Sequence, residues 1–154
     1  MNATQGVGPQ WAAVTTVGDL FGKTAAEFSH DAMVFPGERL TYPELDAKSD
    51  AFARSLMSLG IGLRDGIGIL LPNCLDHVVA LLGIAKAGAV AVPVNGRFRH
   101  GELRHVIKNS DMKILLATGG GDPATDQSDL IATAIPDLAA LAKGRTETLS
   151  LIHI

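Results

Sequence analysis

Three short and almost wholly apolar runs, separated by segments with helical periodicity, constrain the fold of this chain more than any other feature. The runs are Ile67 to Leu71, Ala89 to Val94 and Lys113 to Ala117. Between them, Leu75 to Ala87 and Glu102 to Lys108 show the spacing of amphipathic helices. Apolar strands that alternate with helices are typical of a parallel sheet, joined by right-handed crossovers. The sequence therefore predicts an α/β fold with a mainly parallel sheet and helices on both faces.

The region before this unit shows local signals of a helix and a hairpin. Apolar residues recur every three or four positions from Val17 to Phe28, as an amphipathic helix requires. Short strands are predicted at Ala32 to Phe35 and around Arg39 to Leu40, and Pro36-Gly37 between them favours a turn. These segments predict a helix followed by a small hairpin.

The clearest local signal is a capping box at Thr41 and Glu44. The Thr41 hydroxyl can accept from the Glu44 amide while the Glu44 carboxylate reaches back to the Thr41 amide. A helix is predicted from Tyr42 to Leu59, because apolar residues follow one face and Gly60 is a natural residue to end it.

The composition describes an ordinary globular protein, with 47% apolar and 19% charged residues. The formal charge of −3 and the absence of a basic run argue against nucleic acid as a partner. The most apolar stretch, Leu75 to Val94, is interrupted by polar residues and a proline, so no membrane span is predicted. A single cysteine, Cys74, and an N-terminus without a signal-peptide pattern favour the cytoplasm.

The strand and helix pattern invites a search for a nucleotide-binding loop. Asp65 and Leu71 stand where a third glycine would complete the loops that begin at Gly60 and Gly66. Gly119 to Gly121 has no Lys-Ser/Thr pair behind it, and we interpret it as a surface loop. A small Rossmann-type nucleotide binder therefore lacks its glycine fingerprint.

No constellation of residues predicts a catalytic group or a metal site. His100 and His105 form the closest histidine pair, but five positions align poorly on a helix for a shared metal. Cys74 is interpreted as a buried small residue. The acidic residues are interpreted as solvated faces of helices: Glu27, Glu44, Asp46, Asp50 and Glu102.

The cluster Arg97-Phe98-Arg99-His100 is the one plausible binding site, because it directly follows an apolar strand at the sheet edge where α/β folds place ligands. A guanidinium presents a fork of donors that suits phosphate, so one interpretation is contact with an anion. The alternative is a solvated loop that Phe98 anchors to the core.

Two long segments resemble a known family. The sequence GERLTYPELDAKSDAFARSLMSLGIGLRDGIGILLPN, from Gly37 to Asn73, is similar to the opening of the AMP-forming acyl-activating enzyme superfamily. KAGAVAVPVN from Lys86 and RFRHGELRHVIKNSDMKILLAT from Arg97 resemble the continuation in acyl-CoA synthetases. The resemblance covers nearly all of residues 16 to 118.

This resemblance implies an enzyme that adenylates a carboxylic acid with ATP and magnesium and then transfers the acyl group to coenzyme A. It implies that Arg97 matches an arginine with which some acyl-CoA synthetases contact a phosphate of coenzyme A. The later family motifs, among them the Ser/Thr/Gly-rich phosphate loop and a C-terminal catalytic lysine, are missing from the sequence. We therefore expect the N-terminal part of such a ligase, inactive on its own, whose acid substrate is open among fatty, aromatic and small branched acids.

The chain is divided by pattern into three parts. Residues 1 to 15 are expected to be a loose leader, and residues 16 to 148 the incomplete N-terminal part of an AMP-binding domain. Residues 149 to 154 coincide with one reading frame of the mosaic-end sequence of a transposon-based sequencing kit, and we hypothesise adapter read-through there. The alternative hypothesis is a self-standing, non-catalytic α/β interaction or regulatory module.

Overall fold

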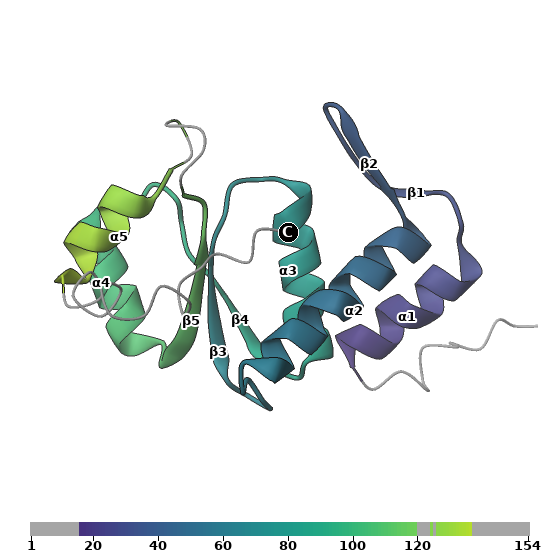
Figure 1. Ribbon diagram of the computed structural model, residues 1–154, viewed down its shortest axis with the longest axis horizontal. Helices are drawn as coiled ribbons and strands as arrows, with labels where there is room; N and C mark the ends of the chain where they lie inside the picture. The colour runs from purple at the N-terminus through teal and green to yellow at the C-terminus, as the bar shows by residue number, and fades with distance from the viewer. Residues whose placement is uncertain (1–15, 120–123, 125, 137–154) are drawn as a thin grey trace, which may run out of the picture.

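A three-stranded sheet lies between two layers of helices in the computed structural model, which describes residues 16–119, 124 and 126–136 (Figure 1). Within these residues, the elements in chain order are α1 (Val17–Glu27), β1 (Asp31–Phe35), β2 (Glu38–Thr41), α2 (Tyr42–Ser58), β3 (Gly66–Leu70), α3 (Leu75–Lys86), β4 (Val90–Pro93), α4 (His100–Asn109), β5 (Met112–Ala117) and α5 (Ser128–Ala134).

The sheet has the strand order β4-β3-β5, and both neighbours run parallel to β3. Ile67 of β3 pairs with Ala91 of β4 on one side and with Ile114 of β5 on the other. All five residues of β3 are buried, as expected for a central strand that helices cover on both faces. The predicted α/β fold with a mainly parallel sheet is confirmed.

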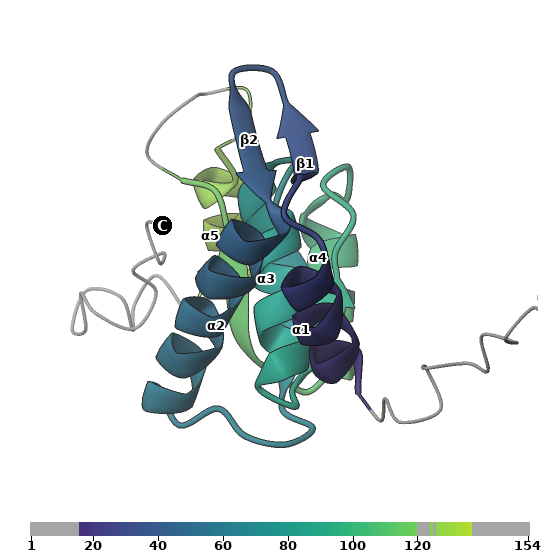
Figure 2. The same cartoon turned by 90° about the vertical axis from the view of Figure 1, so that its right-hand side faces the viewer.

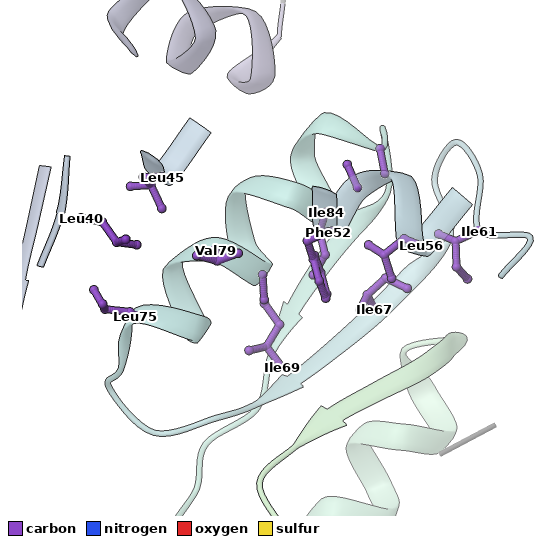
Figure 3. Packing of buried hydrophobic residues seen from close by; sticks show 13 residues of the cluster. Leu40, Leu45, Phe52, Leu56, Ile61, Ile67, Ile69, Leu75, Val79 and Ile84 are labelled. Carbon is purple, nitrogen blue, oxygen red and sulfur yellow. The ribbon is translucent and has the colours of Figure 1, made fainter. Parts of the chain in front are cut away.

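The larger core lies between one face of the sheet and the helices α2 and α3. Ile67 and Ile69 of β3 meet Phe52 and Leu56 of α2 and Ile84 of α3, and all five side chains are at most 3% exposed (Figure 3). α1 packs on the outside of α2 and α3 (Figure 1). Burial of this apolar surface is the main force that holds the three helices to the sheet.

The opposite face of the sheet is covered by α4 and α5. Leu70, Val94, Leu103 and Ala134 form a second buried cluster there. The prediction of helices on both faces is therefore confirmed. Strand β3 contributes to both clusters, because Ile67 and Ile69 face α2 and α3 whereas Leu70 faces α4 and α5.

The capping box that begins α2 is present as predicted. The Thr41 amide donates to Glu44 Oε2 at 2.9 Å, and the Glu44 amide approaches the Thr41 hydroxyl at 3.4 Å. These bonds lower the pKa of Glu44 below its usual 4.5, the backbone bond from Thr41 being the larger cause. Gly60 follows the end of α2 with φ of +82°, a conformation that glycine adopts without strain.

The predicted hairpin is also present, and it stands apart from the main sheet. β1 and β2 pair with each other in antiparallel fashion and with no other described strand. Figure 2 shows this hairpin projecting above α1 and α2. Gly37 in its turn has φ of +82°, which explains the Pro36-Gly37 sequence there.

Helix α4 is longer than predicted. The spacing of apolar residues predicts a helix only from Glu102, whereas α4 begins at His100. The reason is that the Glu102 carboxylate accepts from the Arg99 amide at 2.8 Å, which makes Arg99 the N-cap residue.

The last described helix, α5, ends at Ala134, before Pro136. The predicted leader and the tail at residues 149–154 lie outside the described residues. Among the helices that the structure describes, none combines the length and the apolar character needed to cross a bilayer.

Candidate functional site

An open pocket of about 360 Å³ lies where the carboxyl ends of the parallel strands meet. Residues 70–73 at the end of β3, residues 95–97 after β4, Ala124 and Gln127 line it. Parallel strands of α/β folds leave ligand sites at this edge, where the chain departs to opposite faces of the sheet. Here α3 follows β3 on one face and α4 follows β4 on the other (Figure 1).

Arg97 lies at the rim of this pocket with an exposed side chain. Its backbone amide donates to the Asn95 side-chain oxygen at 3.0 Å, a bond across two residues that holds the loop in a turn. Within the part of the chain that the structure describes, no carboxylate forms an ion pair with its guanidinium. The Arg97 guanidinium is therefore open to solvent at the rim of the pocket.

Phe98 holds the loop against the protein. Its half-buried ring packs on the smaller core with Val94 and Leu103, and its amide donates to the Asn95 carbonyl at 3.0 Å. The anchoring role predicted for Phe98 is present, and it fixes the backbone on which Arg97 stands. The interpretation as an anchored loop thus applies to Phe98. The interpretation as an anion contact concerns Arg97, the residue before it.

The pocket also contains three side-chain amides that the sequence analysis did not single out. Asn73, Asn95 and Gln127 come from three separate segments and lie in its lining. A carboxamide offers both donors and an acceptor, so the pocket combines one cation with several hydrogen-bonding groups. A ligand that carries phosphate and further polar groups suits this lining. The sequence carries a signal for two of these residues, because Asn73 closely follows the apolar strand β3 and Asn95 closely follows the apolar strand β4.

The remaining candidates from the sequence do not form a site within the described residues. Cys74 is half-buried at the N-cap position of α3, and its side chain makes no capping bond. The predicted loop at Gly119 to Gly121 lies largely outside the described residues. Among the described side chains, no three of the types His, Cys, Asp and Glu gather as metal ligands would.

The interpretation of the acidic residues as solvated faces needs a correction for two of them. Asp46 and Asp50 of α2 each form an ion pair with Lys86 of α3, whose side chain is only 11% exposed. The spacing along α2 puts both carboxylates on one face, and the packing of α3 brings the lysine to them. This cluster joins helices and lies outside the lining of the pocket.

Comparison with protein families finds one model that covers most of the chain. The model for the AMP-binding enzyme family matches residues 21–152.

Curated relatives include ligases and synthases. Over 106 residues the chain is 37% identical to a medium/long-chain-fatty-acid–CoA/3-oxocholest-4-en-26-oate–CoA ligase from Mycolicibacterium smegmatis, a match that covers 69% of this chain and 18% of the relative. It is 36% identical over 106 residues to surfactin synthase subunit 1 from Bacillus subtilis, with 68% of this chain and 3% of the relative covered. The match spans about a fifth, or less, of the length of these relatives.

Solved structures show the same arrangement. The N-terminal domain of FACL13 from Mycobacterium tuberculosis superimposes with a TM-score of 0.65 at 25% identity, covering 80% of this chain and 36% of that one. A Mycobacterium tuberculosis fatty acyl CoA synthetase gives a TM-score of 0.65 at 25% identity, with 90% of this chain and 25% of that one covered.

Proposed function

Because the chain belongs to the AMP-binding enzyme family, we propose that it is the N-terminal scaffold of an ATP-dependent acid–CoA ligase. The complete enzyme would adenylate a carboxylic acid, release pyrophosphate and then form a thioester with coenzyme A in the cytoplasm. The observation that carries this proposal is the family match over residues 21–152, together with a relative that is named a CoA ligase and shares 37% of the aligned residues.

The second step of this reaction, formation of the thioester with coenzyme A, is supported by the lining of the pocket. A guanidinium without an ion-pair partner among the described residues stands beside side-chain amides at the carboxyl ends of the strands. We assign Arg97 to a phosphate of coenzyme A, because a planar fork of donors binds phosphate oxygens in pairs. The relative surfactin synthase subunit 1 is not named a CoA ligase, so the coenzyme A step rests on the ligase relatives and on this pocket.

ATP and magnesium are assigned to other parts of the complete enzyme. The described residues contain no cluster of metal-ligating side chains, and the glycine-rich phosphate loop of the family is missing from the sequence. Catalysis of adenylation depends on charge stabilisation at the reacting phosphate and on orientation of the carboxylate. We therefore propose that the 154-residue chain is inactive by itself.

The proposal is tested first by the coding sequence beyond codon 148 and by the protein that it encodes. We expect a Ser/Thr/Gly-rich phosphate loop downstream and acid-dependent exchange of pyrophosphate into ATP by the complete protein. The exchange is measured with a panel of fatty, aromatic and small branched acids, and the 154-residue chain serves as the control without activity. A native stop codon near residue 148, with a monomer that unfolds cooperatively, would instead favour a self-standing interaction or regulatory module.

The role of Arg97 is tested in the complete protein by Arg97→Met. Loss of a charge-assisted bond predicts a KM for coenzyme A that is about 10-fold to 100-fold higher. The ATP–pyrophosphate exchange rate should stay unchanged, and Arg97→Lys should restore part of the affinity. Arg54→Met, which removes an exposed arginine of α2, is the matched control. An unchanged KM for coenzyme A in Arg97→Met would refute this assignment.

A further inference from the structure

The loop between β4 and α4 contains an asparagine that a glycine follows, at the rim of the pocket. Asn95 and Gly96 are both exposed, and both line the pocket beside Arg97. Asparagine is one of the thermally labile residues of proteins. Its side-chain carbonyl carbon can be attacked by the backbone amide of the next residue, and glycine hinders this attack least because it has no Cβ atom. The pair therefore combines a reactive sequence with an open position in the fold.

The hydrogen bonds of the loop favour this attack. The Arg97 amide donates to the Asn95 side-chain oxygen at 3.0 Å. This bond draws electron density from the carbonyl carbon and stabilises the negative charge that forms on the oxygen during attack. The ring that the hydrogen bond closes contains every atom of a succinimide: Cγ, Cβ, Cα and the carbonyl carbon of Asn95, and the nitrogen of Gly96.

The attacking amide of Gly96 is free within the described residues. The Phe98 amide donates to the Asn95 carbonyl at 3.0 Å and closes a turn in which Gly96 is the second residue, whose amide takes no part in the turn bond. No other hydrogen bond to this amide forms among residues 16–119, 124 and 126–136. An ideal Cβ atom at Gly96 meets nothing within 4 Å, so the loop has room to close the ring.

Asn109 shows the opposite arrangement, although it too is exposed and precedes a small residue. Its side-chain nitrogen donates to the His105 carbonyl at 2.7 Å. The Ser110 amide, which would have to attack, donates to the Val106 carbonyl at 3.0 Å. Helix α4 thus holds both groups, and ring closure at Asn109 requires that the end of the helix unwinds.

We propose that Asn95-Gly96 is a site of spontaneous modification in the folded protein, and that its products weaken anion binding at Arg97. Hydroxide removes the proton of the Gly96 amide, and the nitrogen then bonds to Cγ of Asn95. The bond from Cγ to the side-chain nitrogen breaks, and this nitrogen takes a proton from water and leaves as ammonia, which regenerates hydroxide. Water then opens the succinimide at either of its carbonyl carbons and gives aspartate or isoaspartate. Water is the one co-reactant, and nothing is oxidised or reduced.

Each product changes the surroundings of Arg97. Aspartate places a carboxylate where a neutral amide stood, two residues before the guanidinium, and this charge competes with an anionic ligand. In isoaspartate the oxygen that holds the Arg97 amide becomes part of the main chain, and the loop lengthens by a methylene group. This second part of the inference rests on the proposed function, because the anion assigned to Arg97 is a phosphate of coenzyme A.

The modification is tested by incubating the complete protein at mildly alkaline pH and following its peptides by mass spectrometry. Conversion replaces a side-chain nitrogen by oxygen, which the peptide mass records, and methylation by isoaspartyl methyltransferase identifies isoaspartate. We expect conversion at Asn95 to be roughly 10-fold faster than at Asn73 or Asn109. Gly96→Ala should slow it roughly 10-fold, because the added methyl group hinders the attack. The fold accepts this control, since the space at Gly96 is open and its φ is not positive.

The effect on Arg97 is measured on the converted protein. Its KM for coenzyme A should be roughly 10-fold higher than that of fresh protein, while ATP–pyrophosphate exchange stays unchanged. Incubated Gly96→Ala should keep its initial KM. Conversion in an Arg97→Met background should raise KM no further, because the two changes act on the same contact.

Other outcomes would overturn the proposal. Conversion of Asn95 in urea but not in the folded protein would show that the fold protects the pair. Equal rates at Asn95 and Asn109 would exclude a role of the loop geometry. Conversion that leaves KM for coenzyme A unchanged refutes the effect on Arg97 alone, whereas fresh protein without any pyrophosphate exchange refutes the proposed function alone.

Discussion

The ammonium nitrogen of Lys86 lies 2.6 Å from Oδ1 of Asp46 and thereby ties α3 to α2. The same nitrogen lies 2.6 Å from Oδ1 of Asp50 and 3.0 Å from the Asp46 carbonyl oxygen. It also stands 5.7 Å from the ring centroid of Phe21, which extends the cluster to α1. One largely buried cation therefore connects the three helices that cover one face of the sheet.

Replacement of Lys86 by methionine should destabilise the chain by about 1 to 3 kcal/mol. The change keeps much of the side-chain volume but leaves Asp46 and Asp50 facing each other without their cation. Urea unfolding followed by circular dichroism measures the loss. Lys48→Met, at an exposed position of the same α2 helix, should change stability by less than about 0.5 kcal/mol. Equal effects of the two substitutions would show that the cluster contributes nothing specific.

Gly83 permits the close approach of α3 to α2, so Gly83→Ala should destabilise the chain by about 1 to 3 kcal/mol. A Cβ atom there would lie 2.7 Å from Phe52 Cδ1 and 2.9 Å from the Ser49 carbonyl oxygen. The matched control is Gly22→Ala in α1, where an added Cβ meets nothing within 4 Å. That control should stabilise the chain by about 0.5 to 1 kcal/mol, because alanine favours the helix. Thermal or urea unfolding of both variants measures the change in stability. A Gly83→Ala variant that is more stable than the natural chain would contradict the close approach of α3 to α2 at this residue.

Arg104 fastens the end of α5, so Arg104→Met should loosen that helix locally. Nε donates to the Ala134 carbonyl at 2.8 Å and Nη2 to the Thr133 carbonyl at 3.2 Å. Loss of both bonds should speed amide exchange within residues 128–134 by roughly tenfold and leave β3 unchanged. Arg54→Met on α2 is the control, and exchange that rises equally in both variants would refute the role of Arg104.

Acid should remove the stabilisation that Asp65 provides. The bond from Lys113, followed by the bond from the Gly62 amide, lowers the pKa of Asp65 below its usual 3.8. A folded-state pKa below the unfolded one stabilises the fold fully above the unfolded value, and this contribution is lost as the pH falls through the folded value. The difference in urea midpoint between the natural chain and Asp65→Asn should therefore shrink between about pH 5 and about pH 2. A difference that stays constant over this range would contradict the assignment.

Most secondary structure was predictable because its signals are local. The capping box of Thr41 and Glu44 and the glycine at position 60 act within one helical turn, and α2 ends within one residue of its predicted limit. The apolar runs identified all three strands of the sheet because helices cover both faces of that sheet. The start of α4 was missed by two residues, because an arginine N-cap carries no sequence signal of its own.

The candidate site was predictable only in part. Its position followed from the rule that ligands bind at the carboxyl ends of parallel strands, and Arg97 lies there as expected. Gln127 lines the same pocket although it lies some 30 residues beyond Arg97 in the sequence, and no local sequence pattern predicts that the two residues meet. The assignment of Arg97 to coenzyme A stays a prediction.

By itself, the sequence determined the helices, the strands, their parallel arrangement and the family, because each depends on periodicity, caps or contiguous matching residues. Only the tertiary structure decided the strand order β4-β3-β5 and the meeting of Lys86 with Asp46. These depend on side chains that lie tens of residues apart and meet only when the apolar faces of the helices are buried against the sheet.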